Sequence, residues 1–188
     1  MSKPMRIPEG KIVLTYDDYV ELPNDGNRYE ILEGELAVTP APTPPHQNAS
    51  VNLTRILSQH IKTNDLGKLY HAPIDLMLES TSVLQPDLLF VAKTRRNIIT
   101  ARGIEGAPDL VIEILSPTTT RNDRVNKAQI YARHKVPAYW IVDPEQETLE
   151  IYLLDADSYR LFAILQGDEP RPVPPFTDLK LAAKDIFI

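Results

Sequence analysis

The chain has 188 residues, of which 43% are hydrophobic and 24% are charged, a composition typical of one globular domain and not of a disordered or fibrous protein. It contains no cysteine, which excludes disulfide scaffolds, thiolate metal sites and cysteine nucleophiles. Its net charge of −6 argues against a protein that coats nucleic acid by bulk electrostatics. We expect a single domain over residues 1–188, with residues 1–14 as an N-terminal extension.

The N-terminus lacks the features of a secreted or membrane-inserted protein. Pro4, Pro8 and Glu9 stand where a signal peptide requires an apolar segment. No later stretch approaches the roughly 18 apolar residues of a membrane-spanning helix. We therefore expect a cytoplasmic protein without membrane contact.

The first part of the chain predicts two helices separated by a strand pair. Residues 15–22 have Thr15 as a helix N-cap and two aspartates in the first turn, where the helix dipole favours anions. Residues 28–34 and 35–40 are β-branched and alternating, which predicts a hairpin. After a proline cluster, residues 46–65 predict an amphipathic helix, whose apolar residues recur every three or four positions: Val51, Leu53, Ile56, Leu57 and Ile61.

The middle of the chain predicts a sheet that includes a βαβ unit. Four strands are expected, over residues 68–79 with a division at Pro73, 85–92, 108–116 and 138–143. A basic helix or loop over residues 93–106 separates two of them. The run 110–115 is apolar apart from one carboxylate, as in a strand buried on both faces. A helix over 121–135, capped by Thr118 to Thr120, makes residues 109–142 a strand–helix–strand unit.

The last part of the chain predicts another strand pair. Residues 148–154 and 158–166 are expected to form an antiparallel hairpin. A proline-rich stretch follows, and residues 177–188 predict a short helix that packs on the sheet. The order of these elements indicates an α/β or α+β fold with one mixed sheet.

Glu113 is the most informative residue, because an ionised carboxylate in a buried strand costs several kcal/mol unless a cation or donor compensates it. Asp87 opens the neighbouring strand, and carboxylates on adjacent strands can lie about 5 Å apart and share one divalent cation. Asp109 lies four residues before Glu113, about 13 Å away at ~3.3 Å per residue, so these two cannot share an ion. The sequence therefore predicts a site for Mg²⁺ or Mn²⁺, which both prefer hard oxygen ligands, at Asp87 and Glu113.

Lys127 is the candidate cation beside this site. Leu115, two residues beyond Glu113 on the same face, carries no charge. The helix over 121–135 places Lys127 at the margin of an apolar face, from which its stem packs while its amine reaches over the sheet edge. That face comprises Val125, Ala128, Tyr131 and Ala132. Asp123, four residues earlier, is positioned to hold Lys127 through an i,i+4 pair.

Basic residues are concentrated in one segment. From Lys93 to Lys135 there are nine basic and four acidic residues, a net charge of +5 inside a protein of net charge −6. Such a segment suits contacts to a phosphodiester backbone, which position a nucleic acid without reading its bases. The candidate contacts are Lys93, Arg95, Arg96, Arg121 and Arg124.

Several of these segments together resemble a known family. The run GAPDLVIEILSPTTTRNDRVNKAQIYARHKVPAYWIVDPE, with QPDLLFV, RYEILEGEL and PTPPHQ upstream, resembles the Uma-two group of restriction endonucleases, a branch of the PD-(D/E)xK nuclease superfamily. The resemblance extends from about Thr15 to Ile188. It implies one PD-(D/E)xK endonuclease-like domain: a restriction-endonuclease-like mixed β-sheet flanked by helices, with added β-hairpins. The implied activity is Mg²⁺- or Mn²⁺-dependent hydrolysis of phosphodiester bonds in DNA.

The resemblance also implies roles for single residues. Asp87 matches the aspartate of the Pro-Asp motif and Glu113 its second acid, both as metal ligands. Leu115 occupies the place of the superfamily's lysine, and Lys127, on the following helix, is the implied replacement. Glu30 matches an acidic position near the first strand, as a third, outer carboxylate.

Less specific interpretations remain open beside this one. One alternative is a catalytically weak or inactive nucleic-acid-binding or assembly module on the same fold. In such a scaffold Glu113 would simply pair with Arg121 or Lys127. The two are distinguished by whether Asp87, Glu113 and Lys127 converge on a cation-sized gap or are plugged by a basic side chain. A third interpretation is an interaction protein whose proline-rich segments 40–45 and 170–175 act as ligands.

Two further expectations concern the histidines and the assembly. His46 is interpreted as a residue of the helix start, and His60, His71 and His134 are too scattered for a zinc site. An exposed edge strand and the modest chain length predict a homodimer, which would place two sites on two DNA strands.

Overall fold

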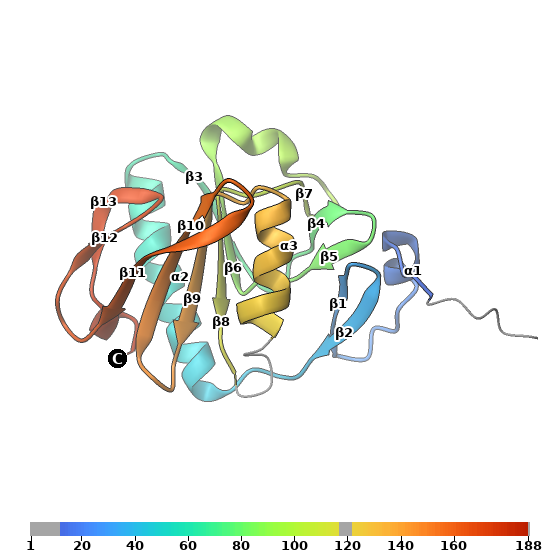
Figure 1. Ribbon diagram of the computed structural model, residues 1–188, viewed down its shortest axis with the longest axis horizontal. Helices are drawn as coiled ribbons and strands as arrows, with labels where there is room; N and C mark the ends of the chain where they lie inside the picture. The colour runs from blue at the N-terminus through green and yellow to red at the C-terminus, as the bar shows by residue number, and fades with distance from the viewer. Residues whose placement is uncertain (1–11, 117–121, 188) are drawn as a thin grey trace, which may run out of the picture.

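The computed structural model describes residues 12–116 and 122–187, with only the backbone described at residues 122 and 123. The mixed α+β class is confirmed (Figure 1). The helices are α1 (Tyr16–Val20), α2 (Pro44–Thr63), η1 (Lys93–Ile98), η2 (Asn122–Lys127), α3 (Ala128–Arg133) and η3 (Ala183–Asp185). The strands are β1 (Arg28–Leu32), β2 (Glu35–Thr39), β3 (Gly67–His71), β4 (Leu76–Glu79), β5 (Ser82–Leu84), β6 (Leu88–Ala92), β7 (Ile104–Glu105), β8 (Leu110–Ile114), β9 (Ala138–Asp143), β10 (Thr148–Asp155), β11 (Ser158–Gln166), β12 (Arg171–Val173) and β13 (Phe176–Leu181).

The central layer is a six-stranded sheet in the order β11-β10-β9-β8-β6-β3. Its parallel pair, β8 and β9, is joined through η2 and α3 as the predicted βαβ unit. Helix α2 covers one face of this sheet and α3 the other (Figure 1). The β8 strand is buried on both faces as predicted: Ile112 belongs to the core cluster of Leu53 and Leu57 on α2, and Val111 to that of Tyr131 on α3.

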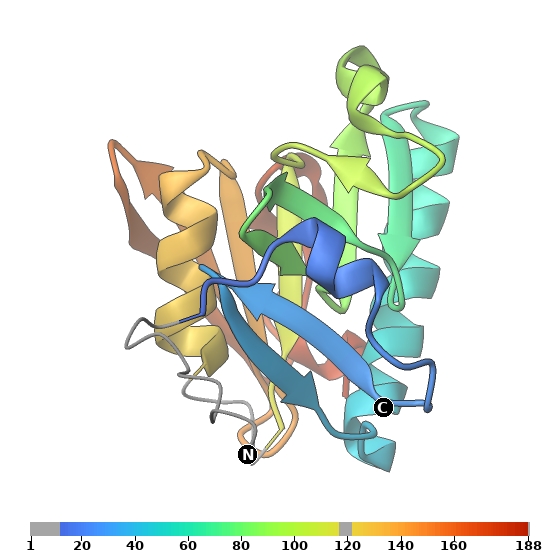
Figure 2. The same ribbon diagram turned by 90° about the vertical axis from the view of Figure 1, so that its right-hand side faces the viewer.

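A second sheet, of five strands in the order β2-β1-β5-β4-β7, lies beside the first. The prediction of one mixed sheet was therefore wrong. The predicted strand over 68–79 divides at Pro73, with β3 in the larger sheet and β4 in the smaller one, because proline cannot donate to a strand ladder. Figure 2 shows hairpin β1–β2 lying between α2 and α3, across the end of β8.

Three other local predictions need correction. Helix α2 begins at Pro44, two residues earlier than expected, since prolines fit the first helical turn, where their missing N–H group is not needed. The side chain of Val51 is 62% exposed, and the apolar face of α2 uses Ala49 instead. The tail forms a strand, β13, before the short η3, because Phe176 and Leu181 pack into the core from a small β12–β13 sheet.

The predicted helix over 121–135 is also different in detail. Its described part is a π-helical segment, η2, followed by α3. A pattern read at 100° per residue does not hold through a π-helix, whose hydrogen bonds span five residues, and Val125 is accordingly 46% exposed. The predicted caps, Thr118 to Thr120, lie outside the described residues, as do residues 1–11 of the predicted extension. In the part of the chain that is described, no helix is long and apolar enough to span a membrane.

Candidate active site

Glu113 lies at the centre of a buried polar cluster. It stands on β8 and its side chain faces α3, where its Oε1 accepts hydrogen bonds from the Tyr131 hydroxyl (2.7 Å) and from Lys127 Nζ (3.2 Å). Burial raises the pKa of Tyr131 well above its usual range, and so do the nearby glutamates. Tyr131 therefore remains a hydrogen-bond donor at neutral pH and fixes the orientation of the Glu113 carboxylate.

Lys127 is buried and bridges two carboxylates. It is only 5% exposed, and its Nζ lies 3.0 Å from Glu30 Oε1 and 3.2 Å from Glu113 Oε1. A solvated position of the Lys127 amine is thereby excluded. The side chain of Asp123 is outside the described part, so its predicted pair with Lys127 stays a prediction.

Glu30 is an inner carboxylate, whereas an outer one was expected. It is 1% exposed on β1, where its side chain lies against Lys127 of η2. Its carboxylate accepts hydrogen bonds from the backbone N–H of Gln85 (2.7 Å) and the hydroxyl of Thr39 (3.3 Å). Glu30 is therefore a second carboxylate partner of Lys127, beside Glu113.

Asp87 immediately precedes β6, in antiparallel register with β8. Leu88 pairs with Ile112, so one further step places Asp87 opposite Glu113, where Cβ atoms of facing residues are about 5 Å apart. Its Oδ2 accepts the backbone N–H of Ile114 at 2.8 Å. The predicted juxtaposition of the two acids on adjacent strands is thus present in the fold.

Three groups compensate the charge of Asp87. His46 Nε2 lies 3.2 Å from its Oδ2, and Arg28 approaches its Oδ1 at 3.4 Å. Burial, the largest single influence, raises the pKa of Asp87, but the hydrogen bonds and charges of His46, Ile114 and Arg28 together lower it below its usual value. Asp87 is accordingly ionised at neutral pH.

The three predicted residues Asp87, Glu113 and Lys127 line one small cavity of about 20 Å³. His46 and Arg28 also line it. A space of this size holds about one water molecule or ion. The three side chains thus converge on a cation-sized gap, which is the arrangement expected of a metal site. Basic side chains nevertheless face both carboxylates.

The donor set fits a hard divalent cation. Carboxylate oxygens suit Mg²⁺ and Mn²⁺, and Mg²⁺ is commonly held by one or two carboxylates together with substrate phosphate and water. Among the described residues, no group of three or more His, Asp or Glu side chains is arranged to hold a metal. Any ion held by Asp87 and Glu113 would thus occupy an open site and not a closed protein cage.

Sequence reasoning missed the contacts of His46, Arg28 and Tyr131. His46 does lie in the first turn of α2, as interpreted, but it also contacts Asp87. Its Nδ1 is buried and has no hydrogen-bond partner within the described structure. His46 and Arg28 lie in the segments PTPPHQ and RYEILEGEL, whose resemblance to the family was the signal that could have pointed to them. Tyr131 was assigned only to the apolar helix face.

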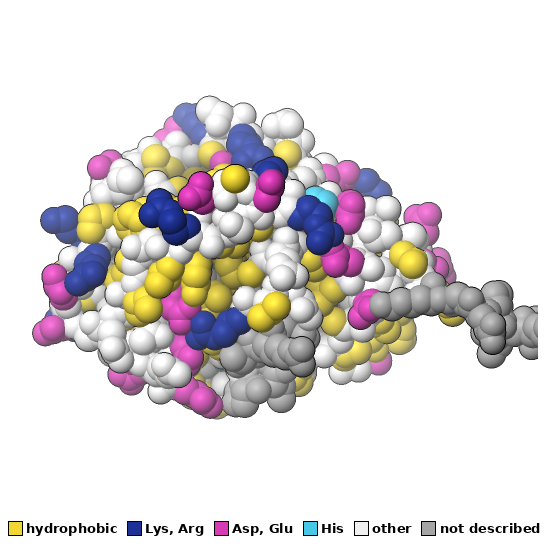
Figure 3. Space-filling view, in the orientation of Figure 1, with side chains coloured by type: hydrophobic (Ala, Val, Ile, Leu, Met, Phe, Trp, Pro, Cys, Tyr) yellow, Lys and Arg dark blue, Asp and Glu magenta, His cyan; other side chains and the backbone are white. Residues whose placement is uncertain are grey.

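The basic residues that were predicted to contact a phosphodiester backbone are largely paired with carboxylates. Lys93 pairs with Asp65, and Arg96 lies 4.0 Å from the same carboxylate. The remaining described contacts pair similarly, Arg95 with Asp109 at 3.0 Å and Arg124 with Glu150 at 2.8 Å. Arg121 lies outside the described residues. Figure 3 shows basic and acidic side chains interspersed on the face that carries α3 and β11. These contacts stay a prediction.

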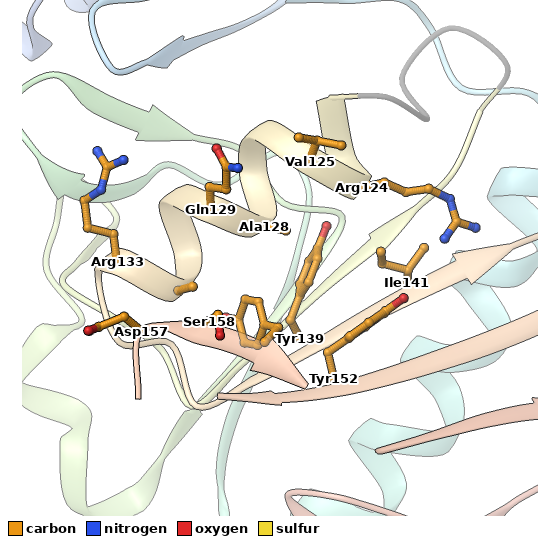
Figure 4. A pocket seen from close by; sticks show the side chains of 12 residues that line it. Arg124, Val125, Ala128, Gln129, Arg133, Tyr139, Ile141, Tyr152, Asp157 and Ser158 are labelled. Atoms are coloured by element: carbon orange, nitrogen blue, oxygen red, sulfur yellow. The ribbon is translucent and has the colours of Figure 1, made fainter. Parts of the chain in front are cut away.

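Among the described residues, a larger pocket shares no lining side chain with the carboxylate cavity; Figure 4 shows this pocket from close by. It measures about 510 Å³ and lies between α3 and the sheet, with Tyr139, Tyr152 and Tyr159 among its lining residues. Arg124 lies at its edge. None of the four predicted catalytic residues lines it. Tyr139 and Trp140 are buried core residues, as predicted.

Comparisons with known proteins agree with this architecture. A crystal structure described as a putative nuclease belonging to DUF820 from Anabaena variabilis is similar over 93% of this chain and 97% of that one, with a TM-score of 0.76 and 23% identity. At that identity the likeness shows the fold. No curated protein matches the chain. The model of the Uma2 (Uma-two) family, described as putative restriction endonucleases, matches residues 16–184, and the chain therefore belongs to this family.

Proposed function

We propose that this protein is a divalent-metal-dependent endonuclease of the PD-(D/E)xK type that hydrolyses phosphodiester bonds of DNA. One observation carries the proposal: the carboxylates of Asp87 and Glu113 and the amine of Lys127 line the same ion-sized cavity. Membership of the Uma-two family supports a nuclease in general. Metal dependence and the DNA substrate are our inference from the chemistry of the cavity.

Each side chain of the cluster has a role in this proposal. Asp87 and Glu113 would hold Mg²⁺ or Mn²⁺, which when bound neutralises charge on the scissile phosphate and increases the acidity of the attacking water. Lys127 stabilises the negative charge that develops on the phosphate. Glu30 positions Lys127 through a second ion pair, and Tyr131 orients Glu113.

The proposal includes the surroundings in which the enzyme works. We place this enzyme in the cytoplasm. A homodimer would present two sites to the two strands of a duplex. Strand β11, at the edge of the six-stranded sheet, is its candidate interface.

A second candidate function is a nucleic-acid-binding or assembly module on the same fold. It is favoured by the two cations that face the acids, since Arg28 lies 3.4 Å from Asp87 and Lys127 lies 3.2 Å from Glu113. If these pairs persist when divalent cations are added, the carboxylates would be structural ion pairs and not metal ligands.

Calorimetric titration with Mg²⁺ and Mn²⁺ separates the two candidates. Wild type, Glu113→Gln and the matched control Asp109→Asn are compared, because Asp109 pairs with Arg95 and does not line the cavity. We expect wild type and Asp109→Asn to bind an ion and to nick supercoiled plasmid, and Glu113→Gln to do neither. Cleavage that is indifferent to Glu113, or wild-type protein that neither binds ions nor cleaves, would favour the binding module.

A further inference from the structure

A groove of about 590 Å³ adjoins the carboxylate cavity. The two share the lining residues Arg28, Pro42, His46 and Asp87. One wall of the groove is the first half of α2, and the other includes His71 and Pro73, between β3 and β4. A strand whose phosphate reached the cavity would therefore continue into this groove.

The α2 wall is a stripe of side chains that are polar apart from one valine. From its first to its last lining residue the helix rises about 13 Å, at 1.5 Å per residue, which is long enough for more than one phosphate at about 3.4 Å of axial rise per nucleotide of a strand. Neutral hydroxyl and amide groups of this kind commonly contact phosphates. The stripe consists of His46, Gln47, Ser50, Val51, Thr54 and Arg55.

The groove also differs in charge from the basic segment. Arg55 is exposed and, within the described part of the chain, has no carboxylate within salt-bridge distance. Among the described residues that line the groove, Asp87 is the single acid, and Arg28 and Arg55 are both cationic. By contrast, Lys93 and Arg96 share the carboxylate of Asp65. The net positive lining therefore lies beside the active site and not on the segment with the most basic residues.

We propose that this groove binds the phosphate backbone of the substrate nucleic acid next to the scissile phosphate. The proposal rests on the function proposed above and assigns its substrate-binding surface. Arg55 contacts a phosphate electrostatically, Ser50 and Thr54 donate to phosphate oxygens, and Arg28 lies where groove and cavity meet. The positive end of the α2 dipole adds to this potential.

The test is binding of a fluorescently labelled DNA duplex, measured by anisotropy in EDTA so that no cleavage occurs. Three charge reversals of exposed arginines are compared: Arg55→Glu in the groove, Arg96→Glu on the basic segment and Arg171→Glu, a control on β12 that pairs with Glu169. We expect Arg55→Glu alone to weaken binding, by about fivefold to tenfold, and to reduce the slope of log K against log salt concentration by about 1.

Each other outcome overturns the proposal that this groove binds the phosphate backbone. Loss of affinity in Arg96→Glu but not in Arg55→Glu would assign the backbone to the basic segment, and equal losses in all three variants would indicate a nonspecific charge effect. No DNA binding by wild type would also refute it. The proposed function is judged separately: cleavage with an indifferent Arg55 refutes only the groove, whereas Arg55-dependent binding without metal-dependent cleavage refutes only the nuclease.

Discussion

At the scale of single residues, Lys127 balances the two buried carboxylates of Glu30 and Glu113. Its amine lies within 3.2 Å of both, so one cation faces two carboxyl groups. Burial of such a group without its cation is strongly unfavourable, because an uncompensated charge in a protein interior costs several kcal/mol. The position of Lys127 is therefore needed for the stability of the fold as well as for the proposed chemistry.

Replacing Lys127 by Met tests this balance. We expect Lys127→Met to lower the free energy of unfolding by about 3–5 kcal/mol, because the methionine fills the space but leaves two buried carboxylates without this cation. The double variant Lys127→Met/Glu30→Gln removes one of these charges and is expected to be more stable than the single variant. Urea denaturation at pH 7 measures both. A loss below about 1 kcal/mol in the single variant would show that the pairs contribute no more than surface ion pairs.

The two acids could be predicted from the sequence because a carboxylate within an apolar strand pattern requires a compensating partner. Glu113 interrupts an apolar strand, and the Pro-Asp that opens the neighbouring strand pointed to Asp87. His46, Arg28 and Tyr131 have no such signal, since each is recognised only by its tertiary contact with one of those acids. Their contributions depend on the packing of α2, β1 and α3 around β8, which local pattern does not specify.

At the scale of elements, the strands with a clear periodicity could be predicted and the irregular connections could not. The β8 strand and the β10–β11 hairpin lie where their apolar patterns placed them. The pattern did not predict that the strands on either side of Pro73 belong to different sheets, because the chain passes from one sheet to the other within a few residues. The π-helical geometry of η2 was not predicted, because the sequence was analysed with the period of an α-helix.

Tyr152 donates a hydrogen bond to a carboxylate of its own strand that also pairs with the helical segment after β8. Arg124 of η2 pairs with Glu150 of β10, and Glu150 Oε2 also accepts the hydroxyl of Tyr152 at 2.6 Å. Burial, followed by this hydrogen bond and the charge of Glu150, raises the pKa of Tyr152 to about 12. A raised pKa means that Tyr152 contributes stability below the unfolded-state pKa of about 10, and that this contribution is lost as the pH rises to about 12.

Absorbance titration of the phenolate measures this shift. The wild-type curve minus that of Tyr152→Phe is expected to have a midpoint near pH 12, provided that the fold persists, which circular dichroism checks at each point. Tyr159→Phe is the control, because burial raises the pKa of Tyr159 further and its difference curve should rise later. A Tyr152 midpoint near 10 would show that its hydrogen bond to Glu150, within β10, opens in solution.

At the scale of the whole molecule, net charge gives little guidance to the binding surface. The +5 segment is neutralised in the fold by acids from other elements, such as Asp65 and Glu150. The groove beside α2 has few charges but almost no acids. Charge counted along the sequence differs from charge on a surface because ion pairs form between distant segments.

The assembly prediction also belongs to this scale. Strand β11 is a nine-residue edge strand that exposes three large apolar side chains within four residues, Leu161, Phe162 and Ile164, and apolar side chains gather on this face (Figure 3). Long, apolar edge strands favour pairing with a second chain. Strand β2, at the edge of the smaller sheet, exposes Leu36 and Val38 but has only five residues.

Light scattering decides between the two edges. We expect wild type to have twice the 21.2 kDa chain mass, Phe162→Lys/Ile164→Lys to be monomeric, and the matched Leu36→Lys/Val38→Lys to remain dimeric. Because a dimer presents two sites to a duplex, the dimeric forms should convert supercoiled plasmid to linear product, whereas the monomer should stop at nicked circles. A wild-type mass of one chain at every concentration would refute the dimer, and monomers produced only by the β2 variant would move the interface to the smaller sheet.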